Sequence, residues 1–140
     1  MCLESVRLYP RRAEKDIEVY KKLNFCDGEL TTFFRNYPVT NVVMKTKPNL
    51  FTIIKIYLTK TINNRFLIEE GFIHSYNPNE ISYYEKYLFE KSVFDGSTMY
   101  VNAVIPKGTL YYKDYWGDTY ASSELILKPS KEQLKYFKNK

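Results

Sequence analysis

The chain has 140 residues, the size of one domain, and is 44% hydrophobic and 26% charged, which excludes an intrinsically disordered protein. Its net charge of +5 suits an anionic partner, but the lysines are scattered, so nucleic acid is not expected as the main ligand. One His and two Cys are too few for a typical structural zinc site, and no cofactor is expected.

No apolar segment reaches the length of a signal peptide or a membrane span. The longest, Leu50 to Leu58, is short and is interrupted by Thr52 and Lys55. Cys2 and Cys26 do not make a disulfide framework. We expect Cys2 to be a small apolar residue beneath a sheet, with a nucleophile exposed by removal of Met as the alternative. These features predict a cytoplasmic protein without a membrane partner.

Strand patterns separated by turn signals fill most of the chain. Asp16 to Leu23 alternates, with Ile17, Val19 and Lys21 on one face, and its charges are typical of an edge strand. Thr98 to Ile105 alternates throughout, which places its odd-numbered residues on one face. Further strands are expected at Phe51 to Thr59, Asn64 to Glu69, Thr109 to Lys113 and Ser123 to Lys128, with Asn63-Asn64 as a hairpin turn.

Two segments carry helix signals. The first starts at Asn77, which can cap a helix that has Pro78 at its first position. The second starts at Ser130, where Gln133 completes a capping-box spacing. The apolar residues expected to face inward are Ile81, Tyr84 and Leu88 in the first helix and Leu134 and Phe137 in the second. The prediction is a single α+β domain over residues 1–140: a twisted, mostly antiparallel sheet with two helices packed against it.

Catalytic motifs such as GxSxG, HExxH, the P-loop and GxGxxG are absent from the sequence. A catalytic triad would have to use His74, the only histidine, and Glu69 and Glu70 are adjacent and so point to opposite faces of a strand. His74 and Ser75 lie at a strand end just before the first expected helix, a place where free N–H groups bind anions. The alternative is that His74 satisfies a local hydrogen bond.

The aromatic share of 17%, with 14 Tyr, is the unusual figure, and much of it falls between Ile105 and Glu124. Rings interleaved with lysines suit a flat nucleobase and a phosphate. The alternative is a hairpin whose rings cover a small sheet. Ser122 and Glu124 can hold a ribose or form a turn. Tyr20 is expected to share a cleft with His74. The candidate ligand-binding residues are Tyr20, His74, Ser75, Lys107, Tyr111, Tyr112, Trp116, Tyr120, Ser122 and Glu124.

Four segments together resemble a family of small proteins from Bacteroides-type bacteria and their phages. They are Met1-Cys2-Leu3, Ala13 to Lys21 (AEKDIEVYK), Gly71 to Tyr76 (GFIHSY) and Pro106 to Ser122 (PKG…YAS). The Ile73 in GFIHSY departs from the GFHS spacing of the family. The resemblance implies a common fold and carries no particular activity.

A weaker resemblance is to the ADP-ribosyltransferase-like fold, in which a Ser-rich strand and a late strand that ends in Glu flank a nicotinamide-dinucleotide cleft. Ile73 to Tyr76 and Ser122-Ser123-Glu124 occur in that order. Ser122 stands where the first Glu of the family's Glu-x-Glu would be, so the resemblance implies nucleotide binding more than catalysis.

Three functions follow from these features. The first is a non-catalytic protein that binds a small anionic ligand, above all a nucleotide, as in phage-type sequestration of a host signalling nucleotide. The second is a protein–protein interaction module, such as an inhibitor of a host defence protein or a virion component. The third is a degenerate ADP-ribosyltransferase-like enzyme that uses Glu124. A homo-oligomer is compatible with all three.

Overall fold

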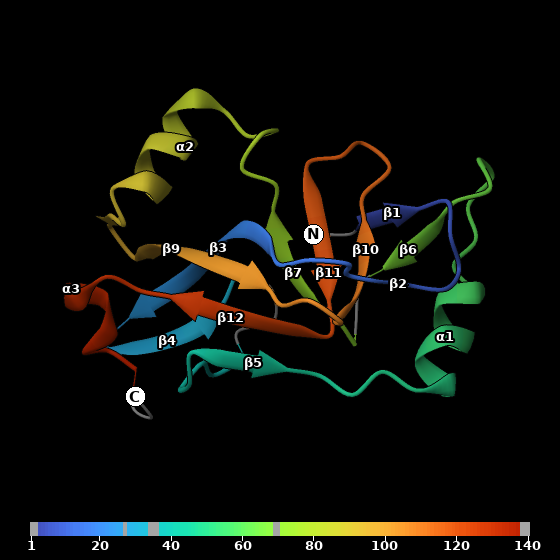
Figure 1. Ribbon diagram of the computed structural model, residues 1–140, viewed down its shortest axis with the longest axis horizontal. Coiled ribbons are helices and arrows are strands. Elements are labelled where there is room, and N and C mark those ends of the chain that lie inside the picture. The colour runs from blue at the N-terminus through green and yellow to red at the C-terminus, as the bar shows by residue number, and fades with distance from the viewer. Residues whose placement is uncertain (1–2, 27, 34–36, 69–70, 138–140) are drawn as a thin grey trace.

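The structure, a computed structural model, describes residues 3–26, 28–33, 37–68 and 71–137 (Figure 1). The expectations for Cys2 and for the pair Glu69 and Glu70 lie outside the described residues. Within the described part, the helices are α1 (Leu50–Tyr57), α2 (Tyr83–Glu90) and α3 (Lys131–Leu134). The strands are β1 (Leu3–Ser5), β2 (Arg11–Arg12), β3 (Ile17–Cys26), β4 (Glu29–Thr32), β5 (Val43–Lys45), β6 (Phe66–Ile68), β7 (Ile73–Tyr76), β8 (Phe94–Asp95), β9 (Thr98–Ile105), β10 (Leu110–Lys113), β11 (Thr119–Ser122) and β12 (Glu124–Lys128).

One large sheet dominates the fold, and all of the strand pairs found among the described residues are antiparallel. Its strand order is β2-β10-β11-β7-β3-β9-β12-β5, with β4 paired to β3 and β8 paired to β9. β1 and β6 form a separate two-stranded sheet. The α+β prediction is therefore confirmed in its broad form, but the sheet is larger than expected and the described helices are three short ones rather than two.

The pairing of β3 with β9 is the centre of the large sheet. It runs from Ile17 opposite Ile105 to Asn24 opposite Thr98. β3 is thus an interior strand, and the prediction of an edge strand was wrong. Its charges do not require a free edge, because Glu18 is exposed and Lys22 is half-buried although the strand has neighbours on both sides. The odd-numbered residues of β9 are all buried in the main core, as the alternation predicted, and they are Met99, Val101, Ala103 and Ile105.

Helix α1 replaces the strand predicted from Phe51 to Thr59. The side chain of Asn49 accepts a hydrogen bond from the Thr52 backbone, and the Thr52 hydroxyl accepts one from the Asn49 backbone. This capping box starts a helix that buries Ile56 against the small sheet. The β-branched residues that suggested a strand express only a weak preference, which the cap and the packing override. The Asn63-Asn64 pair accordingly lies in a loop between a helix and a strand.

The N-cap of helix α2 lies five residues after the cap predicted at Asn77. Ser82 is its N-cap, while the Asn77 amide donates to the Gly117 carbonyl and holds a turn instead. Leu88 and Phe89 are its buried residues, and Tyr84, predicted to face inward, is 65% exposed. Leu88 therefore faces inward as predicted and Ile81 packs against the same cluster, while Phe89 is buried there and Tyr84 is not.

Helix α3 starts at Ser130 with the predicted capping box to Gln133. Phe137 is fully buried as expected, whereas Leu134 is partly exposed. Gln133 is buried in its place, because its amide donates to the carbonyls of Tyr100 and Ser92. The helix is thus held to β9 by polar contacts as well as by its apolar face.

Candidate functional site

The candidate site lies where β3 and β7 separate. The two strands pair only at Tyr20 opposite Tyr76, so the carbonyl of His74 on β7 has no backbone partner across the gap. The ammonium of Lys21 fills that place and donates to the His74 carbonyl oxygen over 2.6 Å. Lys21 reaches this position because it occupies the inward face of β3, between Val19 and Leu23.

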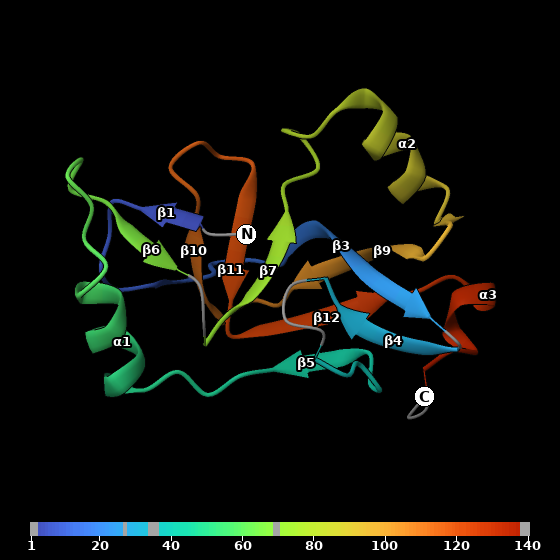
Figure 2. The ribbon, with the colours of Figure 1, turned by 180° about the vertical axis from the view of Figure 1, so that it is seen from behind.

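A cavity of about 440 Å³ opens beside this hydrogen bond. Lys21 and His74 line it from the central sheet, and residues 37–46 and Gly71 line it from the opposite side. The strands that carry these residues, β3, β4, β5 and β7, come together on the side of the molecule seen in Figure 2. The lining combines an apolar part, to which Val39, Met44 and Ile73 contribute, with polar groups at Thr40, Asn41 and Thr46.

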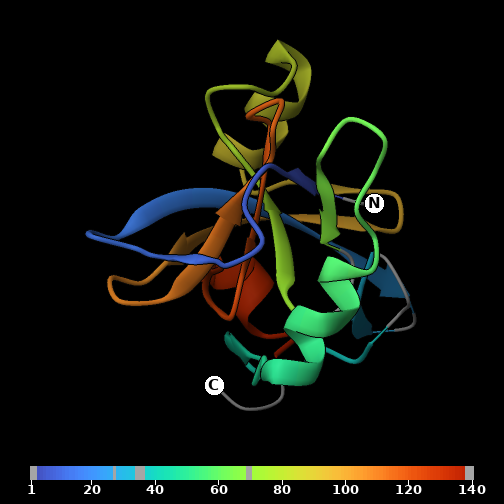
Figure 3. The ribbon, with the colours of Figure 1, turned by 90° about the vertical axis from the view of Figure 1, so that its right-hand side faces the viewer.

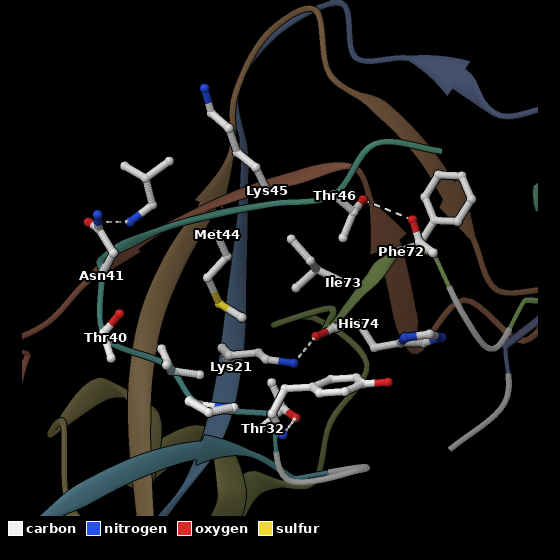
Figure 4. Close-up of a pocket in the computed structure, with 15 residues that line it drawn as sticks. Lys21, Thr32, Thr40, Asn41, Met44, Lys45, Thr46, Phe72, Ile73 and His74 are labelled. Carbon is white, nitrogen blue, oxygen red and sulfur yellow. Dashed lines mark hydrogen bonds between the residues drawn. The ribbon is translucent and has the colours of Figure 1, made fainter. Parts of the chain in front are cut away.

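Lys21 is the main electrostatic feature of the cavity. It is 8% exposed, and burial lowers its pKa to about 8. No carboxylate of the described residues pairs with it, and the His74 carbonyl is its one hydrogen-bond partner there, although an ammonium has three N–H donors. Figure 4 shows Lys21 directed towards His74, while Lys45 extends away. The fold therefore holds a buried cation with unused donors against an open cavity.

A second, smaller cavity of about 110 Å³ lies next to the first and shares Lys21 and His74 with it. Ser75 also lines this space. Ser75 is 2% exposed, and its hydroxyl has no hydrogen-bond partner among the described residues. A buried hydroxyl without a partner is unfavourable, and this oxygen is itself enclosed rather than open to the cavity.

The imidazole of His74 is used in a hydrogen bond of its own. Its Nε2 lies 2.8 Å from the Ile68 carbonyl oxygen, which can only accept, so Nε2 carries the proton. Burial, together with the nearby charge of Lys21, lowers the pKa of His74 and favours the neutral ring. His74 thus offers the cavity its carbonyl oxygen, and its ring matches the alternative of a locally satisfied histidine.

The aromatic hairpin, β10 and β11, belongs mainly to the cores. Tyr112 is buried against Phe72, and its hydroxyl donates to the Leu8 carbonyl over 2.5 Å. Burial raises the pKa of Tyr112 to about 12. Tyr120 is buried in the main core and Tyr111 packs against it, with ring centroids 6.1 Å apart. These rings line neither cavity that contains Lys21.

The remaining predicted residues are dispersed. Tyr20 stacks on Phe89 of α2, with ring centroids 4.4 Å apart. Trp116 is exposed and donates from Nε1 to Glu4, and the Lys107 backbone donates to the Asp16 carboxylate. Ser122 is fully buried and its hydroxyl has no hydrogen-bond partner within the described part of the chain, and Glu124 lies 3.8 Å from the Lys45 ammonium at the cavity rim. Of the ten candidates, His74 and Ser75 are the two brought together at the cavities.

Sequence reasoning missed Lys21 and the segment 37–46. The segment carries no chemical motif, and only the fold brings it to β7. For Lys21, the signal was present, since a lysine occupies an inward position in the alternating pattern Ile17, Val19, Lys21, Leu23. Burying a charged side chain among apolar ones is unfavourable, so a lysine at an inward position indicates a candidate functional residue.

Comparisons with family models, curated proteins and solved structures found no match to this chain. Within the described residues, no helix has the length and apolar character needed to cross a membrane. The same part of the chain contains no group of three or more His, Cys, Asp and Glu side chains placed to hold a metal ion. The function is therefore inferred from the geometry around Lys21.

Proposed function

We propose that this protein binds a small organic anion, with a nucleotide as the first candidate, in the cavity between β3, β7 and residues 37–46. The observation that carries the proposal is the buried ammonium of Lys21, which has one hydrogen-bond partner among the described residues and opens into the cavity. An anion at this point would supply the missing counter-charge and accept the unused N–H donors. Such a ligand would stabilise the charged form of Lys21.

The size and lining of the cavity support an organic ligand rather than a bare ion. A volume of about 440 Å³ falls in the range of small-molecule sites. Val39, Met44 and Ile73 can cover an apolar ligand body, while Lys21 binds its charged end. Tyr37, which lines the cavity and is 59% exposed, is available to stack on a flat ring such as a nucleobase.

The described residues of the site include groups that bind but no evident catalytic pair. The ring of His74 is bonded to Ile68, and Glu124 is beside Lys45 rather than Lys21. This arrangement favours a role in holding a ligand over one in turning it over. Sequestration of a signalling nucleotide is the role that we assign to such binding.

The test is a thermal-shift measurement with AMP, ADP-ribose, benzoate and adenosine. A ligand at about one hundred times its Kd should raise the Tm by roughly 6 °C. AMP or ADP-ribose acting without benzoate identifies a phosphate site, and benzoate acting alone identifies a carboxylate site. Adenosine, which lacks the negative charge, should give no shift.

The matched variants are Lys21→Met and Lys128→Met. Both remove one positive charge, but Lys128 is exposed on β12 and does not line the cavity. The ligand-induced shift should disappear in Lys21→Met and persist in Lys128→Met. Flat melting curves for the wild type across the whole panel, or equal shifts in Lys21→Met and the wild type, would overturn the proposal.

A further inference from the structure

Helix α1 has an outer surface that is apolar rather than polar. Its inner face packs Ile56 against the small sheet. Its outer face and the loop that follows carry large apolar side chains between 44% and 97% exposed, namely Leu50, Phe51, Ile54, Tyr57, Leu58 and Ile62. A surface helix ordinarily turns charged and polar residues towards water. Six large apolar residues on one exposed element therefore indicate a surface that is covered in use.

The segment that carries this surface is basic, although Glu69 and Glu70 follow it directly in the sequence. Between residues 30 and 68 the sequence contains six Lys and Arg and no Asp or Glu. Of these, Lys47, Lys55 and Lys60 flank or belong to α1, are exposed, and form no ion pair with a described residue. The apolar surface thus has three lysines beside it without an ion-pair partner among the described residues, and an acidic counter-surface would complement them.

The position of α1 leaves it accessible. It lies at the opposite end of the long axis from α2 and α3 (Figure 1). Figure 3 looks onto that end, and no other ribbon lies in front of α1. An extended flat surface could therefore approach this end without meeting the rest of the fold.

We propose that the α1 surface, defined by the six apolar residues and the three lysines above, docks on an anionic lipid bilayer. The apolar side chains would enter the boundary between headgroups and acyl chains, and the lysines would lie at the level of the lipid phosphates. A protein interface usually has a rim of both signs, and pairing of α1 with a second copy would bring like charges together. The three exposed lysines, which form no ion pair with a described residue, favour the bilayer. The helix would lie on the membrane and not cross it, and this proposal departs from the sequence-based expectation of a protein without a membrane partner.

The test is cosedimentation of the full chain with vesicles of phosphatidylcholine alone and of phosphatidylcholine mixed equally with phosphatidylglycerol. The protein should bind the mixed vesicles and bind the neutral ones at least about tenfold more weakly, and added salt should weaken binding. The variants Phe51→Glu and Leu58→Glu should abolish binding. Because both side chains are more than 70% exposed, these variants should keep the wild-type Tm.

The matched control is Tyr83→Glu on α2, where the native side chain is 93% exposed and at the other end of the molecule. This variant should bind the mixed vesicles as the wild type does. The double variant Lys55→Gln, Lys60→Gln should lose binding to anionic vesicles and leave any neutral binding unchanged. The proposal is overturned if the wild type does not bind, if Leu58→Glu binds equally well, or if the wild type is instead a dimer that Leu58→Glu dissociates.

Discussion

The ammonium of Lys21 donates a hydrogen bond to the main-chain carbonyl of His74, at the point where two strands of one sheet cease to pair. The lysine thereby occupies the place of a backbone N–H that β3 would supply if its pairing with β7 continued. Its charge has no acidic partner among the described residues, so the contact satisfies the carbonyl but leaves the ammonium only partly solvated. The first two predictions follow from these two residues.

The stability of the ligand-free protein should increase with pH between 8 and about 9.5. The pKa of Lys21 is lowered from 10.5 to about 8 by burial, so in this interval the folded state releases a proton that the unfolded state retains. The unfolding free energy should rise by about 2 kcal/mol, measured by urea denaturation. Lys21→Met should flatten the dependence, and a wild-type curve that falls over this interval would contradict the assignment.

His74 should make the stability of the protein depend on pH in the acidic range. Burial is the main effect on this group and lowers the pKa of His74 below 6.5, so the unfolded state takes up a proton before the folded state does. Stability should therefore be complete above pH 6.5 and decrease as the pH falls below it. Because the chain has one histidine, its ring-proton NMR signal can be followed alone, and its midpoint should lie below 6.5. A midpoint above that value would refute the buried, neutral ring.

The hydroxyl of Ser122 should be dispensable for folding. It is fully buried without a hydrogen-bond partner in the described structure, so Ser122→Ala removes an unsatisfied polar group. The unfolding free energy should rise by about 1 kcal/mol. The control is Ser5→Ala, since Ser5 is equally buried but bonds to the backbone of Arg7 in both directions. That variant should lose about 1 kcal/mol, and a loss of the same size in Ser122→Ala would reveal a partner for its hydroxyl.

Gly71 should not tolerate a side chain. Its φ is +83°, and a Cβ there would lie 2.7 Å from the Thr52 Cγ2 of helix α1. Gly71→Ala should lower the unfolding free energy by about 2 kcal/mol, and Thr52→Ser, which keeps the capping hydroxyl and removes that methyl group, should recover part of the loss. Gly117→Ala, with a similar φ of +85° and no atom within 4 Å of the added Cβ, isolates the cost of the backbone conformation. Equal losses at the two glycines would exclude a steric contribution from Thr52.

The parts of the fold that could be predicted from sequence were those specified by neighbours in the chain. The alternation of β9 and the Ser130–Gln133 cap of α3 are local signals, and both were confirmed. Helix α1 was missed because Ile and Thr suggest a strand, while the decisive cap at Asn49 occupies only two side chains. Local preference was a poor guide where a short capped segment packs against a distant strand.

The candidate site was harder to predict because the fold assembles it from distant segments. The sequence predicts His74 as a ligand-binding residue but places Lys21 only on one face of a strand. The facing residues 37–46 carry no motif. The aromatic hairpin attracted attention through its composition. Its rings Tyr112 and Tyr120 are buried in two different cores, which accounts for much of the local excess without a ligand. The composition shows where aromatic residues are concentrated in the sequence, but it does not predict which core each ring joins.

The long pairing of β3 with β9 also bears on how the chain reaches this structure. β3 is synthesised before β9, and the two strands, which pair over eight positions, are separated by more than 70 residues of sequence. During translation, the hairpin with β4 is the one β3 pairing that a neighbouring segment can complete promptly. The centre of the sheet must then wait for a distant segment, so we expect slow folding with a high contact order and a prolonged need for protection from aggregation while the nascent β3 lacks its partner.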